Sequence, residues 1–221
     1  MEKWNSRVLT VALGGLGAGV FGAGISNLLL PGIPIASTLA LWVGLGAATA
    51  YSFARARPAG LLRVRLTDLV WGLGLGLALR ALQGWVSGAD MRAFPSADGT
   101  PGVPSVTWWL TEFLPAGFIG PIVEELFFRA VVLVVVYQVL RRSVGELAAA
   151  ATALLVSAGL FVLLHGMRGS LLLADGVMLF AVGASCGLLV LLTGRLWGAI
   201  ILHVVYNVSF LALAVAGATL G

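Results

Sequence analysis

Charged and sulfur-containing side chains are scarce in this sequence. Only 10% of the 221 residues are charged, and Cys186, inside an apolar stretch, is the single cysteine. One cysteine excludes a disulfide framework and a cysteine-rich metal site. So little charge could not cover the surface of a soluble domain of this length, whereas 60% of the residues are hydrophobic. The composition therefore predicts an integral membrane protein.

The few basic residues do not form a nucleic-acid surface, although the net charge is +4. They lie in short clusters between apolar runs rather than along one face, so we expect no nucleic-acid partner. Such clusters set the orientation of a membrane protein, because basic loops stay in the cytoplasm. With the N-terminus inside, the outside segments hold only Arg92 and Arg168. The cytoplasmic segments then hold nine basic residues: Lys3, Arg7, Arg55, Arg57, Arg63, Arg65, Arg141, Arg142 and Arg195.

Seven apolar runs are long enough to cross a hydrocarbon core, which takes about 20 residues. The backbone must satisfy its own hydrogen bonds in lipid, so each run is expected to be a helix. We predict an all-α, polytopic transmembrane bundle of about seven spans (six to eight), a single membrane domain over residues 1–221, in the cell membrane. The runs are 8–30, 35–54, 69–86, 117–140, 147–165, 171–192 and 196–216. The spans within 8–86 carry no specific motif.

Ionisable side chains inside these spans stand out, because each costs roughly 3 kcal/mol on insertion scales and is a functional hypothesis by default. They are Glu124, Glu125, Arg129, His165 and His203, and the two histidines are the only ones in the chain. A membrane Glu-Glu pair alone more often serves as an ion relay or a structural ion pair, and a lone histidine more often packs in a core. Their coincidence in three separate runs favours a site.

The spacing assigns different tasks to the two acids. Glu125 and Arg129 are four residues apart, so they share a helix face and can pair. Glu124 points about 100° away and lacks that partner. An unpaired buried carboxylate suits proton transfer, whereas a paired one stays charged and structural. Gly120-Pro121 is expected to break the helix and place Glu124 near a helix N-terminus.

The two histidines have helical neighbours of their own. His203 and Asn207 are four residues apart, and Phe161 stands one turn before His165, so each pair shares a face. Counting rises of 1.5 Å from the expected span ends places Glu124 and His203 at depths that differ by roughly 10 Å. The boundaries or the span count must therefore shift if these residues form one site. Arg80 and Asp175 are the remaining charges near the spans, and we assign neither a role.

Together these residues resemble the signature of the CPBP family, which groups CAAX prenyl proteases with bacteriocin-processing and bacteriocin-immunity membrane proteins. The family pattern is Glu-Glu-x-x-x-Arg, then Phe-x-x-x-His, then His-x-x-x-Asn. Here it is carried by residues 124–129, 161–165 and 203–207. The resemblance covers about residues 115–213. Ala130 departs from the glycine that many members have after the arginine.

The resemblance implies an intramembrane endopeptidase that hydrolyses a peptide bond of a membrane-associated or lipidated peptide or protein. Its partners would be membrane lipid and that substrate. Glu124, assisted by His165, would activate water, and His203 and Asn207 would stabilise the oxyanion. Glu125, Arg129 and Phe161 would support the site, with Arg129 anchoring Glu125.

Metal dependence and two other functions stay open. Glu124, His165 and His203 could hold a divalent metal such as zinc and leave a position for water. The chain has no His-Glu-x-x-His helix, so we favour a metal-free glutamate mechanism. A non-catalytic bacteriocin self-immunity or scaffold protein of the same fold is the main alternative. A proton-coupled transporter is disfavoured, because the chain shows no paired halves with interrupted helices.

Overall fold

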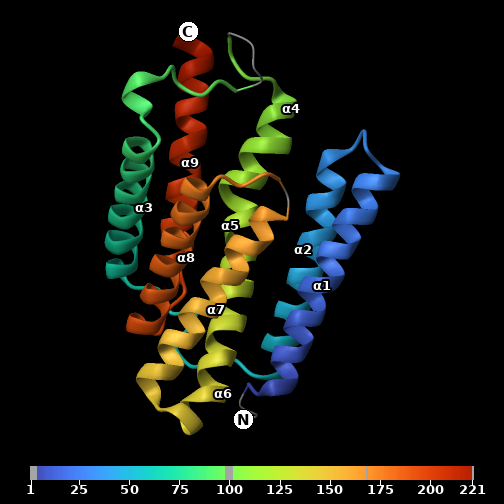
Figure 1. The fold of residues 1–221 in the computed structure, drawn as a ribbon, viewed down its shortest axis with the longest axis vertical. Coiled ribbons are helices and arrows are strands. Elements are labelled where there is room, and N and C mark those ends of the chain that lie inside the picture. Colours follow the sequence, from blue (N-terminus) through green and yellow to red (C-terminus); the bar gives the residue numbers. More distant parts are fainter. Residues whose placement is uncertain (1–3, 98–101, 168, 221) are drawn as a thin grey trace.

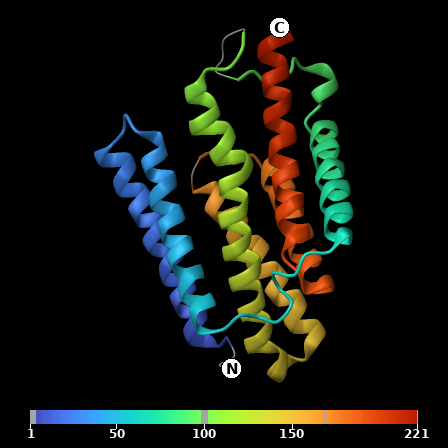
Figure 2. The same ribbon diagram turned by 180° about the vertical axis from the view of Figure 1, so that it is seen from behind.

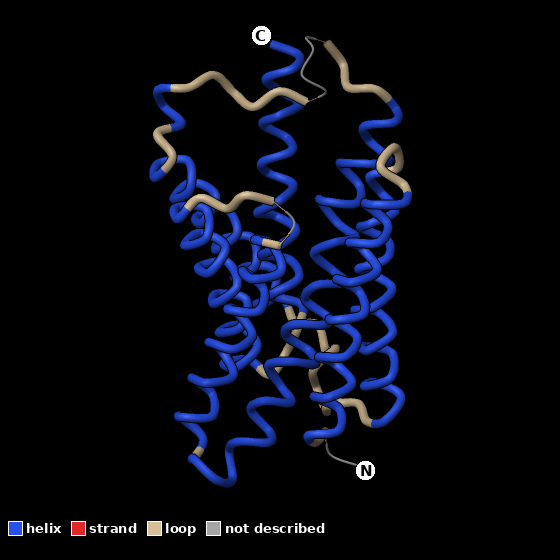
Figure 3. Tube along the Cα trace, turned by 45° about the vertical axis from the view of Figure 1, so that its right-hand side comes forward, coloured by secondary structure: helices blue, strands red, loops and turns tan. Residues whose placement is uncertain are grey.

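The computed structural model describes residues 4–97, 102–167 and 169–220, and within these ranges all regular structure is helical. Figure 1 shows the helices running along the long axis of the molecule, with the N-terminus and the C-terminus at opposite ends. Figure 3 shows how little of the chain lies in loops. The predicted all-α bundle is confirmed.

Six helices are long and apolar enough to cross a membrane, which indicates a multi-pass membrane protein. They are α1 (Ser6–Leu29), α2 (Pro34–Arg55), α3 (Leu66–Val86), α7 (Glu146–Gly166), α8 (Leu173–Thr193) and α9 (Trp197–Leu220).

A seventh, composite helix runs without a break from Val106 to Val144. The expected break at Gly120-Pro121 is wrong, because Gly120 keeps right-handed helical angles and its N–H bonds to the carbonyl of Pro115. This wider π-type turn absorbs a proline that has no N–H to donate. The predicted span 117–140 therefore began too late. The composite helix consists of α4 (Val106–Trp108), η2 (Trp109–Phe113), η3 (Pro115–Ile119), α5 (Gly120–Glu125), η4 (Leu126–Leu133) and α6 (Val134–Val144).

Local signals in the sequence explain several helix ends. The side chain of Asn5 accepts hydrogen bonds from the first N–H groups of α1, and Pro34 opens α2. Gly145, with φ of 82°, separates α6 from α7, and Gly194, with φ of 66°, ends α8. Both glycines occupy a backbone region that other residues rarely adopt, so they fix the positions of these turns.

Small residues allow the helices to pack closely. Helix α1 lies against α2, where a Cβ added to Gly44 would come within 2.5 Å of the Gly15 carbonyl oxygen. Helix α3 lies against α9, where Gly72 and Gly76 face Ile201 and the Leu202 carbonyl. Lipid gives no hydrophobic drive for helix association, so such close contacts supply much of the packing energy.

The composite helix occupies the centre of the bundle. The α1–α2 hairpin packs against the second half of the composite helix (α5, η4 and α6), whereas α7 and α9 contact it from other sides. Towards the end that carries the C-terminus, the hairpin leans away from the composite helix, as both Figure 1 and Figure 2 show. The site described next lies at this divergence.

We predict that Gly44→Ala destabilises the protein by about 1–3 kcal/mol, because the new methyl group must force α1 and α2 apart. Gly46→Ala, two residues away with no atom within 4 Å of the added Cβ, is the matched control and should be neutral or slightly stabilising. Thermal unfolding of both variants in detergent measures the difference. Equal shifts of Tm in the two variants would contradict the described packing.

Candidate active site

The structure places a buried ion pair beneath the candidate site. Arg129 and Glu125 are both fully buried, and Nη1 of the arginine lies 2.9 Å from Oε1 of the glutamate. The pair joins η4 to the end of α5, at the spacing that the sequence indicated. A buried charge is tolerated only with a well-placed partner, so each residue requires the other.

Aromatic rings and a glycine complete the surroundings of Arg129. Its guanidinium carbon lies 4.6 Å from the centroid of the Phe161 ring, an arrangement in which the ring face attracts the cation. Among the described residues, no hydrogen-bond acceptor reaches Nε or Nη2 of Arg129. Besides the ion pair with Glu125, the Phe161 ring is therefore a main contact of the guanidinium. Gly183 on α8 leaves room for the guanidinium, since a Cβ there would lie 3.0 Å from Nη2.

Glu125 also binds His203, a contact that no sequence spacing could indicate. Nδ1 of His203 lies 2.9 Å from Oε1 of Glu125, and both side chains are buried. A carboxylate only accepts, so Nδ1 carries the proton and Nε2 points the other way. Glu125 therefore fixes both the orientation and the tautomer of this imidazole, and Arg129 holds Glu125 in turn.

Glu124 faces both imidazoles. Its Oε2 atom lies 4.0 Å from Nε2 of His203 and 4.0 Å from Nε2 of His165. These separations are too long for direct hydrogen bonds and suit groups bridged by a small polar molecule. The depth difference expected between Glu124 and His203 is wrong, because it was counted from a helix start at residue 117, whereas the composite helix begins at Val106.

His165 is oriented by its own helix. Its Nδ1 lies 2.9 Å from the Phe161 carbonyl oxygen, which can only accept, so Nδ1 carries the proton and Nε2 presents its lone pair toward Glu124. The Phe161 ring packs 4.4 Å from the His165 ring and 5.5 Å from the His203 ring, measured between centroids. Phe161 thus spaces the two imidazoles and contacts the guanidinium of Arg129.

Asn207 lies one turn after His203 on α9. Its Nδ2 donates a 2.8 Å hydrogen bond to the carbonyl of Ala116 in η3, which leaves its second N–H available. The carbonyl of Ala116 therefore determines how the carboxamide is presented.

Glu124, His165 and Asn207 line a cavity of about 470 Å³. Its other walls come from the first turns of α2, including Thr38 and Trp42, and from the first half of the composite helix, including Glu112. Residues of α2 were not expected in the site, since the sequence of 8–86 contains no motif. Only the tertiary arrangement brings them there.

A metal site is not supported. Within the described ranges, no three His, Cys, Asp or Glu side chains are arranged to hold a metal ion. This includes Glu124, His165 and His203, which the sequence left open as a ligand set.

Comparison with protein-family models gives a match over residues 106–209, to the family described as type II CAAX prenyl endopeptidase Rce1-like. Residues 106–209 are an Rce1-like domain of the CPBP family. The matched segment begins at the start of the composite helix and ends shortly after Asn207, so it contains every residue of the candidate site outside the α1–α2 hairpin. No curated protein and no solved structure matched the chain.

The Rce1-like domain thus brings together all seven residues that the sequence singled out. Glu124, Glu125 and Arg129 come from the composite helix, Phe161 and His165 from α7, and His203 and Asn207 from α9. Arg80 lies apart, on α3, where its guanidinium donates to the carbonyl of Tyr206. Asp175 lies in the first turn of α8 and is not among the residues lining the cavity.

We predict that Arg129→Met destabilises the domain by about 3–5 kcal/mol, because it leaves Glu125 charged and buried without its cation. The double variant Glu125→Gln/Arg129→Met removes both charges and should regain part of that loss. Thermal unfolding of these two variants and of the single variant Glu125→Gln in detergent tests the pairing. Simple additivity of the two substitutions would show that these charges are not coupled.

Proposed function

We propose that this chain is an intramembrane endopeptidase of the cell membrane, which hydrolyses a peptide bond of a membrane-associated or lipidated substrate. One observation carries the proposal: the Nε2 atoms of His165 and His203 both face Oε2 of Glu124 at 4.0 Å, while the Nδ1 atom of each ring is already bonded elsewhere. Membership in the Rce1-like family supports the same reaction class.

In the proposed first step, a water molecule between Glu124 and His165 attacks the carbonyl carbon of the substrate. Glu124 takes the proton of the water, and the lone pair on Nε2 of His165 orients the water by accepting its second hydrogen. The electrons of the carbonyl double bond move to its oxygen, which becomes an oxyanion.

His203 and Asn207 are proposed to stabilise that oxyanion. In this role His203 acts as an imidazolium, in which Nδ1 donates to Glu125 and Nε2 donates a second proton toward the cavity. The free N–H of Asn207 supplies a second donor, one helical turn away. Donors held in place before the reaction stabilise a developing charge well, because they need not reorganise.

The second step breaks the carbon–nitrogen bond. The oxyanion re-forms its double bond, the electron pair of the broken bond goes to nitrogen, and Glu124 returns its proton to the leaving amine. The products are one carboxylic acid and one amine. Glu124 ends as a carboxylate, ready for another water molecule.

We predict that Glu124→Gln lowers cleavage about 10²–10⁴-fold, because the amide cannot take the proton. Glu146→Gln, an exposed acid at the start of α7, is the matched control and should leave cleavage unchanged. Comparing protein termini in membranes that carry wild-type, Glu124→Gln or Glu146→Gln protein identifies the cleaved bonds. Identical termini for wild-type and Glu124→Gln protein would contradict proteolysis and favour a scaffold or immunity role.

We predict that Asn207→Ala lowers kcat about 10²-fold with little change in KM, since an oxyanion donor acts mainly in the transition state. Steady-state kinetics on a substrate identified from those termini measures the effect, and Tm in detergent is recorded in parallel. A loss of Tm without a selective fall in kcat would assign Asn207 a structural task instead.

A further inference from the structure

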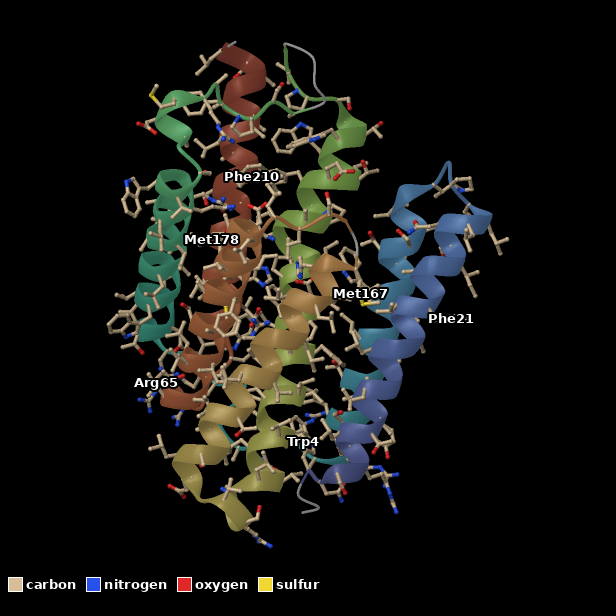
Figure 4. All side chains as sticks on the ribbon, in the orientation of Figure 1. Trp4, Phe21, Arg65, Met167, Met178 and Phe210 are labelled. Atoms are coloured by element: carbon tan, nitrogen blue, oxygen red, sulfur yellow. The ribbon has the colours of Figure 1, made fainter. Side chains whose placement is uncertain are left out.

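The two ends of the molecule differ in charge. The backbone N–H of Leu196 bonds to the carbonyl of Leu61, and the indole N–H of Trp4 bonds to the carbonyl of Ser52, so the N-terminus, the α2–α3 loop and the α8–α9 loop share one end. Figure 4 shows Trp4 and Arg65 toward that end. Eight described basic residues lie in these segments and at the end of α6: Arg7, Arg55, Arg57, Arg63, Arg65, Arg141, Arg142 and Arg195.

The opposite end has little positive charge. Of the described basic residues, Arg92 lies in the segments that connect the helices there, in the loop between α3 and α4. This distribution places the end that contains the N-terminus in the cytoplasm and the other end outside it.

The cavity opens toward the end that is poor in basic residues. Gly32 and Ile33, in the turn between α1 and α2, and Thr107, in the first turn of the composite helix, line its outer part. Glu124 lies farther along the composite helix, and His165 and Asn207 line the same cavity from α7 and α9. The way into the site therefore starts on the non-cytoplasmic side, where the α1–α2 hairpin leans away from the composite helix.

The cavity is also acidic. Glu112, an exposed residue of η2, lines it together with Glu124, and its described lining contains no lysine or arginine. Glu112 makes no ion pair with any described residue, so its carboxylate is free to meet a substrate. A CAAX tail ends in a free carboxylate. Glu112 and Glu124 would repel this carboxylate, and the described lining offers no lysine or arginine to bind it. A lysine or arginine would instead be attracted.

We propose that the site receives its substrate from the non-cytoplasmic side of the membrane and that Glu112 selects a peptide segment carrying a basic residue. The proposal rests on the proteolytic function proposed above. The cut is then made within a chain, next to a cationic segment, rather than close to a free C-terminal carboxylate. Glu112 is a specificity-determining residue at the mouth of the cavity. It lies several helical turns before Glu124, where the proton transfer takes place.

Cysteine labelling tests the side of entry without any need for activity. Gly32→Cys places a thiol at the mouth, where an added Cβ meets no atom within 4 Å, and Ser143→Cys places one at the basic end of α6. Native Cys186 is fully buried and gives little background. In spheroplasts, a membrane-impermeant maleimide should label Gly32→Cys, and should label Ser143→Cys only after permeabilisation. The reverse pattern would overturn the proposed side of entry.

Peptide cleavage tests the role of Glu112. The probes are palmitoylated fluorogenic peptides with an amidated C-terminus and one fixed Lys, Gln or Glu, offered to the full-length protein in detergent. Wild-type protein should prefer Lys, and Glu112→Gln should lower the Lys-over-Gln ratio up to about fivefold, as for a solvent-exposed ion pair. Glu146→Gln is the control and should keep the wild-type ratio. A ratio that Glu112→Gln leaves unchanged would overturn the selection by Glu112. If wild-type and Glu124→Gln proteins cleave equally little, the proteolytic function itself fails, whereas the labelling result still decides the side of entry.

Discussion

The guanidinium of Arg129 has no exposed surface, and its charge is balanced by Glu125, which lies one turn before it, 2.9 Å away. Glu125 in turn binds Nδ1 of His203, so one buried cation determines how an imidazole on a different helix is held. The ring of Phe161 contacts this cation and both imidazoles. The geometry of the site therefore depends on a charge that never touches the cavity.

The helices before the Rce1-like domain complete the site rather than merely accompany it. Helix α2 contributes a wall of the cavity, and α3 packs closely on α9, where Arg80 donates to the carbonyl of Tyr206, the residue before Asn207. Asp68 on α3 also pairs with Arg195, which precedes α9, and this hydrogen-bonded ion pair raises the pKa of Arg195. The position of α9, and with it His203 and Asn207, is thus supported from outside the matched segment.

Hydropathy and local spacing predicted most of the fold, and the ionisable residues in three separate runs, with the family resemblance, indicated the seven side chains that the structure brings together. Apolar runs of about 20 residues located the spans, and the four-residue spacing of Glu125 and Arg129 indicated their ion pair. The contact of His203 with Glu125 could not be predicted, because it joins residues 78 positions apart and depends on how α9 docks. Pro121 was misread as a helix break, since a π-type turn that absorbs a proline leaves no local sequence signal. The catalytic roles of the site residues stay predictions.

The proposed site requires that Glu124 faces both imidazoles, whereas Glu125 bonds to His203 and not to His165. The chain contains two histidines, so ¹⁵N-labelled histidine yields two ring systems that single substitutions can assign. In NMR spectra of the protein in detergent, Glu124→Gln should shift the Nε2 resonances of both rings, and Glu125→Gln should shift the Nδ1 resonance of His203 far more than that of His165. A Glu124→Gln spectrum in which either ring is unchanged would contradict the shared site.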